Sequence, residues 1–114
     1  MFKIRREQKD AFRTEELYDF EARVADHLRR CFPQRWAALG EDAGRALIRH
    51  GIEGASRHGI VTERDVCKFV DLALVFGVDF DRERAWAREI LAGVDPRDPS
   101  AKLRRLHERA MEEA

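Results

Sequence analysis

Four histidines and two cysteines have the greatest capacity for acid–base, nucleophilic or metal chemistry in this chain. No His-Glu-x-x-His motif is present, and we assign no i, i+4 ligand pair to any histidine. All border or join the apolar faces of predicted helices, which indicates structural roles; they are His27, His50, His58 and His107. Cys31 and Cys67 have neither zinc-motif nor redox-motif spacing. Both fall on apolar faces, so we expect buried, reduced thiols.

Two further kinds of site are absent from the sequence. Asp79, Phe80 and Asp81 resemble the start of a calcium-binding loop. Such a loop needs Gly at its sixth position and Glu at its twelfth, and these positions hold Arg84 and Ile90. The chain also has no glycine-rich phosphate-binding loop. We therefore predict no metal, no cofactor and no enzymatic activity.

The composition is that of one globular domain. A chain of 114 residues is long enough to bury a core without disulfide or metal support. The 22 basic and 22 acidic residues balance, so no overall field attracts nucleic acid or a membrane. No secretory signal is recognised, and the longest apolar run, residues 72–78, is too short to span a bilayer. These features predict a cytoplasmic protein.

Helical periodicity positions these residues. We predict an all-α fold, a single compact domain over residues 1–114 with about five or six helices and short connections. Residues 1–13 form either a loose N-terminal arm or a short helix. The other expected helices are Thr14–Phe32, Pro33–Leu39, Gly40–His58, a helix that begins after Thr62 and ends at Gly77, Arg82–Ala92, and a last helix from Pro99.

Helix ends and faces give more specific predictions. Caps are expected at Thr14, Thr62 and Asp98, at Gly59 for a C-terminus, and at Asp79 or Asp81. Small residues should let another helix approach closely; they are Gly44, Gly51 and Gly54. Apolar residues expected to face the core include Trp36, Leu39, Ala43 and Met111.

The helix ending at Gly77 is apolar on nearly every side in its second half. Such a helix is either the centre of the core or a docking surface for another protein, and it can be both. The docking hypothesis assigns partner binding to Leu72, Val75, Phe76 and Phe80.

Basic residues could form a polar rim around that surface, with Arg45, Arg49 and Arg57 on one helix face. A second basic cluster lies near the C-terminus and comprises Lys102, Arg104, Arg105 and Arg109. Acidic residues alternate with both groups, which favours solvated, salt-bridged faces over nucleic-acid binding.

Several motifs, taken together, resemble a family of small all-helical bacterial proteins encoded beside type VI secretion spike and effector genes. The resemblance extends from about residue 20 to residue 110. Its motifs are His27-Leu28-Arg29-Arg30-x-Phe32-Pro33, Leu39-Gly40-Glu41, Ile48-Arg49-x-Gly51-Ile52-x-x-Ala55, Gly59-Ile60-x-Thr62-Glu63-Arg64-Asp65-Val66-Cys67, Phe76-Gly77-x-Asp79-Phe80-Asp81 and Trp86-Ala87-x-x-Ile90-Leu91. It implies an accessory role in a toxin-delivery cassette.

The combined expectation is a non-enzymatic protein-binding module, an adaptor or chaperone for a type VI secretion effector or spike protein. An immunity protein for the neighbouring toxin is an alternative. Another is a homodimeric structural module that uses the same apolar surface. Nucleic-acid binding through the arginine faces ranks lower, and an enzyme ranks last.

Overall fold

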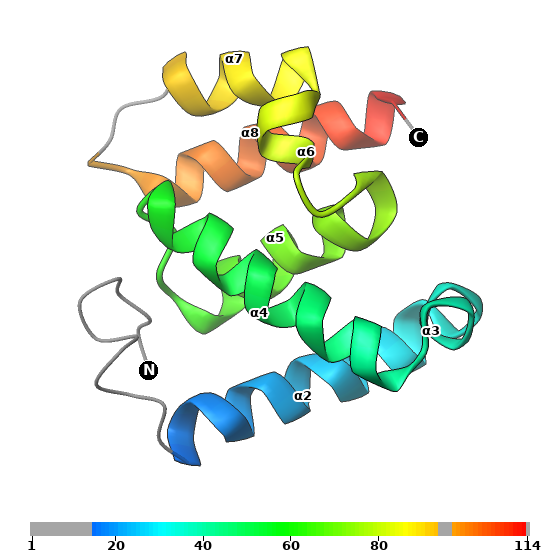
Figure 1. The fold of residues 1–114 in the computed structure, drawn as a ribbon. Helices are drawn as coiled ribbons and strands as arrows, with labels where there is room; N and C mark the ends of the chain where they lie inside the picture. Colours follow the sequence, from blue (N-terminus) through cyan, green and yellow to red (C-terminus); the bar gives the residue numbers. More distant parts are fainter. Residues whose placement is uncertain (1–14, 94–96, 114) are drawn as a thin grey trace.

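The computed structural model describes residues 15–93 and 97–113, and the elements in these ranges are α-helices (Figure 1). The predicted all-α class and single compact domain are confirmed. The predicted cap at Thr14 and the arm at residues 1–13 lie outside the described residues. The helices are α2 (Glu15–Cys31), α3 (Pro33–Leu39), α4 (Glu41–Arg57), α5 (Glu63–Phe76), α6 (Phe80–Glu83), α7 (Ala85–Gly93) and α8 (Pro99–Glu113).

The helices form three layers, with α5 at the centre (Figure 1). Helices α2 and α3 lie on one side of the α4–α5 pair, and α6, α7 and α8 lie on the other. Helix α5 contacts α2, α4, α6 and α8. This position explains why its sequence is apolar on nearly all sides, and its Val66, Val70 and Ala73 are wholly buried.

Glycines allow α4 to pack closely against its neighbours, as their spacing predicts. A Cβ atom on Gly51 would lie 2.8 Å from Cγ2 of Val70 on α5, and one on Gly54 would lie 3.2 Å from the Phe69 ring. At Gly44 the ring of Trp36 takes the place of a side chain, because an added Cβ would lie 2.5 Å from it. Trp36 is accordingly buried, as predicted.

Three predicted caps are present. Gly59 has a φ of 75°, and the N–H of Ile60 donates to the Ala55 carbonyl at 2.9 Å, so the chain leaves α4 through a glycine turn. At the start of α5, Oγ1 of Thr62 accepts a hydrogen bond from a backbone N–H at 3.4 Å. At the start of α8, the carboxylate of Asp98 accepts one from Ala101 at 3.2 Å.

The predicted helix over residues 82–92 is wrong in its boundaries. It is replaced by α6 and α7, which are separated at Arg84, whose φ of −90° and ψ of 120° are extended rather than helical. Asp79 precedes α6 but makes no side-chain cap, because its carboxylate pairs with His50 instead. Asp81 lies inside α6 and is buried, where it accepts a hydrogen bond from His58.

Four residues expected to face the core are exposed: Leu39, Ala43, Met111 and Cys31. Trp36, rather than Leu39 or Ala43, covers the surface of α4 at Gly44. Cys31 and Met111 lie in the last turns of α2 and α8. Cys67 is half-buried. Within the described ranges, no helix has the length and apolarity needed to cross a bilayer.

Candidate functional site

The four residues predicted to bind a partner divide into two groups. Leu72 is 7% exposed and Phe80 is fully buried, with the Phe80 ring 5.0 Å from the Phe69 ring. These two side chains belong to the core and present no surface to a partner in this structure. Val75 and Phe76 are partly exposed, so only they remain accessible.

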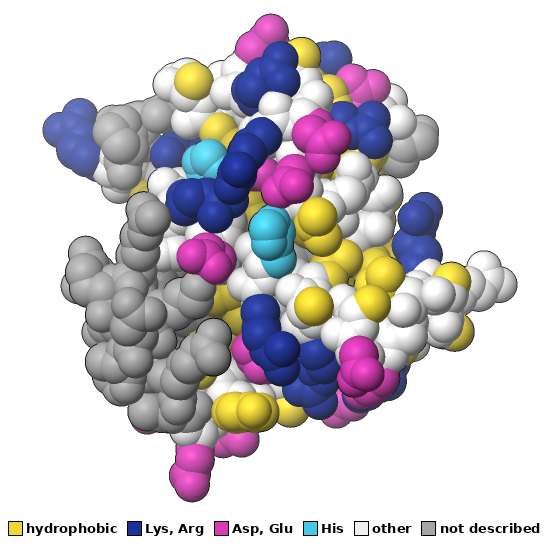
Figure 2. Space-filling model, in the orientation of Figure 1, with side chains coloured by type: hydrophobic (Ala, Val, Ile, Leu, Met, Phe, Trp, Pro, Cys, Tyr) yellow, Lys and Arg dark blue, Asp and Glu magenta, His cyan; other side chains and the backbone are white. Residues whose placement is uncertain are grey.

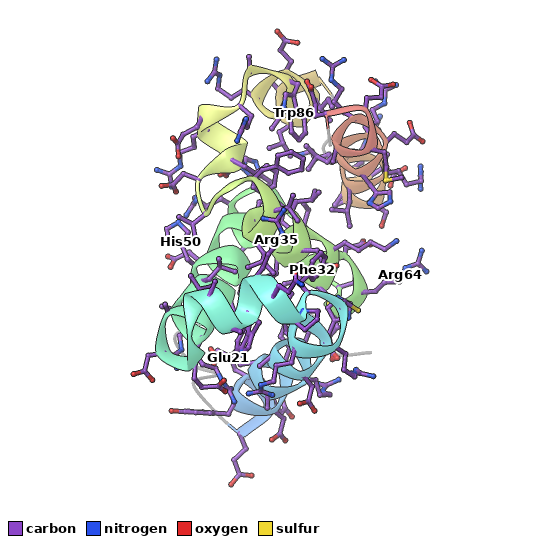
Figure 3. All side chains as sticks on the ribbon, turned by 90° about the vertical axis from the view of Figure 1, so that its right-hand side faces the viewer. Glu21, Phe32, Arg35, His50, Arg64 and Trp86 are labelled. Carbon is purple, nitrogen blue, oxygen red and sulfur yellow. The ribbon has the colours of Figure 1, made fainter. Side chains whose placement is uncertain are left out.

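The accessible part of the predicted surface lies at the C-terminal end of α5. We define the α5-end surface as Val75, Phe76 and Val78, the last of which is 39% exposed. Figure 2 shows apolar side chains gathered over the region where this end of α5 approaches α3 and α4. In Figure 3, Phe32 and Arg35 lie beside α5, while Trp86 lies in the α6–α8 layer.

Phe76 is held in place by contacts on two sides. Its ring packs edge-on against Trp86, with the ring centroids 5.4 Å apart. The guanidinium of Arg84 lies 5.6 Å from the Phe76 ring centroid and donates a hydrogen bond of 3.3 Å to the Phe76 carbonyl. Arg84 is exposed, so a cation lies at the edge of the α5-end surface.

The three arginines predicted to form a polar rim each pair with a carboxylate. Two of these carboxylates, those of Glu21 on α2 and Asp81 on α6, are buried. The N–O distances are 3.9 Å for Arg45 with Glu41, 3.3 Å for Arg49 with Glu21, and 3.8 Å for Arg57 with Asp81. Internal pairing therefore accounts for this basic face, in line with the salt-bridged face that the alternating charges of the sequence favour.

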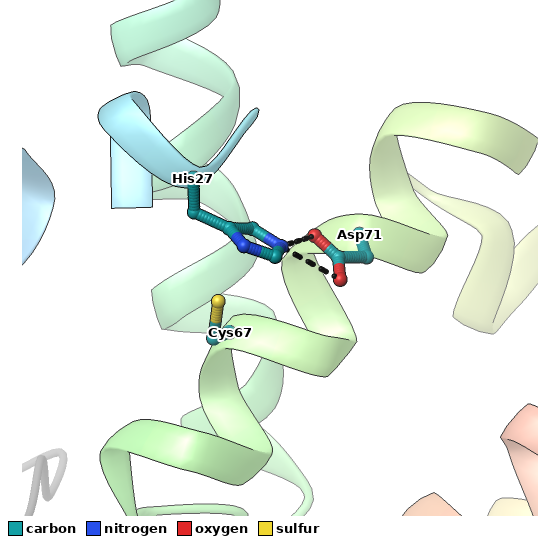
Figure 4. Close-up of side chains that lie close together, drawn as sticks. All are labelled: His27, Cys67 and Asp71. Atoms are coloured by element: carbon teal, nitrogen blue, oxygen red, sulfur yellow. Dashed lines mark hydrogen bonds and ion pairs between the residues drawn. The ribbon is translucent and has the colours of Figure 1, made fainter. Parts of the chain in front are cut away.

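A second candidate site lies where α2 packs against α5, on a different side of α5 from the residues that meet the glycines of α4 (Figure 4). Nε2 of His27 lies 2.9 and 3.1 Å from the two carboxylate oxygens of Asp71. Its Nδ1 lies 3.6 Å from Sγ of Cys31. A ring nitrogen of His27, Sγ of Cys67 and an oxygen of Asp71 all lie within 4.8 Å of one another. We call these four residues the α2–α5 cluster.

Partial burial sets the ionisation of this cluster. Desolvation, and then the negative charges of Asp71 and Cys31, raise the pKa of the Cys67 thiol to about 11. Burial also raises the pKa of Asp71, opposed by its hydrogen bond from His27. The Cys67 thiol is therefore protonated at neutral pH, which makes it a poor nucleophile.

The sequence contains a signal for this cluster that the prediction missed. His27 and Cys31 form one i, i+4 pair on α2, and Cys67 and Asp71 form another on α5. Residues four apart share a helix face, so each pair presents two potential ligands together. His27 therefore has a second potential ligand, Cys31, on the same helix face, which the sequence prediction did not single out. What sequence spacing does not show is that the two pairs face each other.

Two other histidines form simpler pairs with aspartates. His50 lies 3.0 Å from Asp79 at the surface, and His58 lies 2.9 Å from the buried Asp81. The hydrogen bond from His50 is the main cause of a lowered Asp79 pKa. His50 at the molecular edge, labelled in Figure 3, provides an exposed counterpart to His27.

Comparisons of this chain with protein-family models, with curated proteins and with solved structures found no match. Function is therefore inferred from the α5-end surface and the α2–α5 cluster.

Proposed function

We propose that this chain is a non-enzymatic protein-binding module, an adaptor or chaperone for a type VI secretion effector or spike protein, and that it acts in the cytoplasm. The observation that carries this proposal is the α5-end surface. It places partly exposed apolar side chains at the end of the helix that the core holds most completely. The family resemblance of the sequence supplies the class of partner.

The surroundings of the α5-end surface suit recognition of a protein segment. Val75 and Val78 offer small apolar contacts, and Phe76 offers a ring whose orientation Trp86 already fixes. A side chain held in its bound orientation loses little conformational entropy on binding. Arg84 and the carboxylate of Asp79 supply opposite charges close by in the chain, and such rim charges favour one orientation of the partner.

The protonated state of the Cys67 thiol supports a non-enzymatic role. Cys67 is protonated at neutral pH and half-buried, so its thiol does not offer a thiolate to a substrate. Binding rather than covalent chemistry is the function that these residues favour.

Co-expression of the chain with the products of its neighbouring genes tests the proposal. The wild-type chain should copurify with one of them as a stoichiometric complex. Val75→Asp should weaken that complex at least about 30-fold, because it places a charge in an apolar contact. Tyr18→Asp is the matched control: Tyr18 is 65% exposed, lies at the start of α2, and its variant should bind like wild type.

Different results would select the other functions. A self-associated chain that Val75→Asp dissociates would indicate a homodimeric module. Rescue of cells from the neighbouring toxin would indicate an immunity protein. Equal binding by Val75→Asp and wild type would contradict a role for the α5-end surface.

A further inference from the structure

The α2–α5 cluster combines three of the side chains that proteins use to hold transition metals. Imidazole, thiolate and carboxylate are all zinc ligands. Within residues 15–93 and 97–113, His27, Cys67 and Asp71 are the one group of three His, Cys, Asp or Glu residues whose ligand atoms come together in this way. Each is half-buried, so the group is shielded yet remains reachable from solvent.

We propose that the α2–α5 cluster is a zinc site, with His27, Cys67 and Asp71 as ligands and water as the fourth ligand. The proposal is independent of the protein-binding function, because it concerns a different side of α5 from the α5-end surface. It assigns a chemical role to the meeting of His27 on α2 with the i, i+4 pair of Cys67 and Asp71 on α5.

The distances are compatible with a tetrahedral ion after small side-chain movements. Zinc–ligand bonds of roughly 2.0–2.3 Å place neighbouring ligand atoms about 3.3–3.8 Å apart. The ligand atoms of His27, Cys67 and Asp71 lie within 4.8 Å of one another, which is at most about 1 Å beyond this spacing. The His27–Asp71 contact of 2.9 Å is shorter because a proton bridges it, and an ion would replace that proton. We expect rotation about side-chain bonds to close the site.

The rest of the fold holds the two ligand-bearing helices in position. Leu28 is fully buried beside His27, and Val66 and Val70 are fully buried on the ligand-bearing helix α5. The backbones on either side of the cluster are therefore fixed by core packing. Ligands carried on fixed helices lose little entropy on binding an ion, which favours affinity.

Metal titration of the reduced, full-length chain tests this proposal directly. Zinc should bind at one equivalent per chain, raise the unfolding temperature and displace protons from the ligands. Cobalt, as a spectroscopic substitute, should produce a thiolate-to-metal charge-transfer band. Cys67→Ala and His27→Gln should each weaken zinc binding at least about 100-fold, beyond the 10- to 100-fold typical of groups that only orient ligands.

His50→Gln provides the matched control, because His50 also pairs with an aspartate but no third ligand atom joins that pair among the described residues. It should bind zinc like wild type. Circular dichroism establishes that each variant is folded. The proposal is overturned if wild-type chain gives no cobalt–thiolate band, or if Cys67→Ala keeps wild-type zinc affinity. The first readout does not depend on any variant folding.

Discussion

The side of α5 that faces α4 and the side that faces α2 make contacts of different chemical kinds. On the side facing α4, Val70 packs against Gly51 and Phe69 packs against Gly54. These contacts are apolar. On the side facing α2, the contact includes the half-buried pair of His27 and Asp71. One side gains stability from apolar burial and close packing. The other keeps titratable side chains near one another at the edge of the core, where partial desolvation changes their pKa values.

The contrast teaches that a highly apolar helix need not be equally buried along its length or around its circumference. The first two turns and the α4 side of α5 build the core. Its last turn contributes Val75 and Phe76 to the α5-end surface. Its side facing α2 contributes Cys67 and Asp71 to the α2–α5 cluster. Substitutions on the three parts should therefore have separable effects.

The largest effect is expected from Phe69→Ala. Phe69 is 1% exposed and packs against the ring of Phe80. Removing a buried aromatic ring leaves a cavity and should lower the free energy of unfolding by about 3–5 kcal/mol. Urea denaturation followed by circular dichroism measures the change. A loss below about 1 kcal/mol would show that the α4 side of α5 does not carry the core.

A smaller loss is expected where the helices approach most closely. Gly51→Ala places a methyl group 2.8 Å from Val70 Cγ2, and the resulting overpacking should lower stability by about 1–3 kcal/mol despite better helix propensity. Gly93→Ala is the control, because an added Cβ there meets nothing within 4 Å. The control should be neutral or stabilised by up to about 1 kcal/mol. Similar urea midpoints for the two variants would contradict the close packing of α4 on α5.

On the α2 side, stability should depend on alkaline pH through Cys67. The folded chain raises the pKa of this thiol from 9.0 to about 11. The stabilisation is therefore complete below pH 9 and is lost as the pH rises through about 11. Partial exposure limits the effect to at most about 2 kcal/mol. Cys67→Ala should remove this part of the pH dependence in urea unfolding. An unchanged pH profile would contradict the desolvation of the thiol.

The smallest effects should have opposite signs at two aspartates. The raised pKa of Asp71 stabilises the fold below pH 3.8, and this stabilisation is lost as the pH rises through the folded value. The lowered pKa of Asp79 stabilises it above pH 3.8, and this is lost as the pH falls through the folded value. Relative to wild type, Asp71→Asn should therefore gain stability as the pH rises, and Asp79→Asn should lose it. Urea midpoints at about pH 3 and about pH 6 measure both trends, and trends of the same sign would contradict this difference.

Local patterns predicted most of the fold. Apolar periodicity located α2, α4, α5 and α8, and the glycines of α4 correctly indicated close helix packing. The break at Arg84 was missed because no proline or glycine marks it. The place of Asp81 inside α6 was missed because its partner, His58, is distant in the sequence.

The candidate sites were less predictable because they depend on tertiary contacts. Phe80 and Leu72 have the same apolar character as Val75 and Phe76, and only the packing of the neighbouring helices separates buried from accessible residues. His27 and Asp71 are 44 positions apart in the chain, so their contact depends on how α2 crosses α5. Spacing shows that His27 and Cys31 share one helix face and that Cys67 and Asp71 share another, but not that the two faces meet.

Comparison of Val70→Asp with Val75→Asp by urea unfolding tests most directly whether α5 has a structural part and an accessible part. Val70 is fully buried beside Gly51, whereas Val75 is partly exposed in the last turn. We expect Val70→Asp to be unfolded, because an unpaired charge would be buried. We expect Val75→Asp to remain folded, within about 1 kcal/mol of wild type. If Val75→Asp also unfolds, the whole of α5 is structural and the α5-end surface is not a binding site.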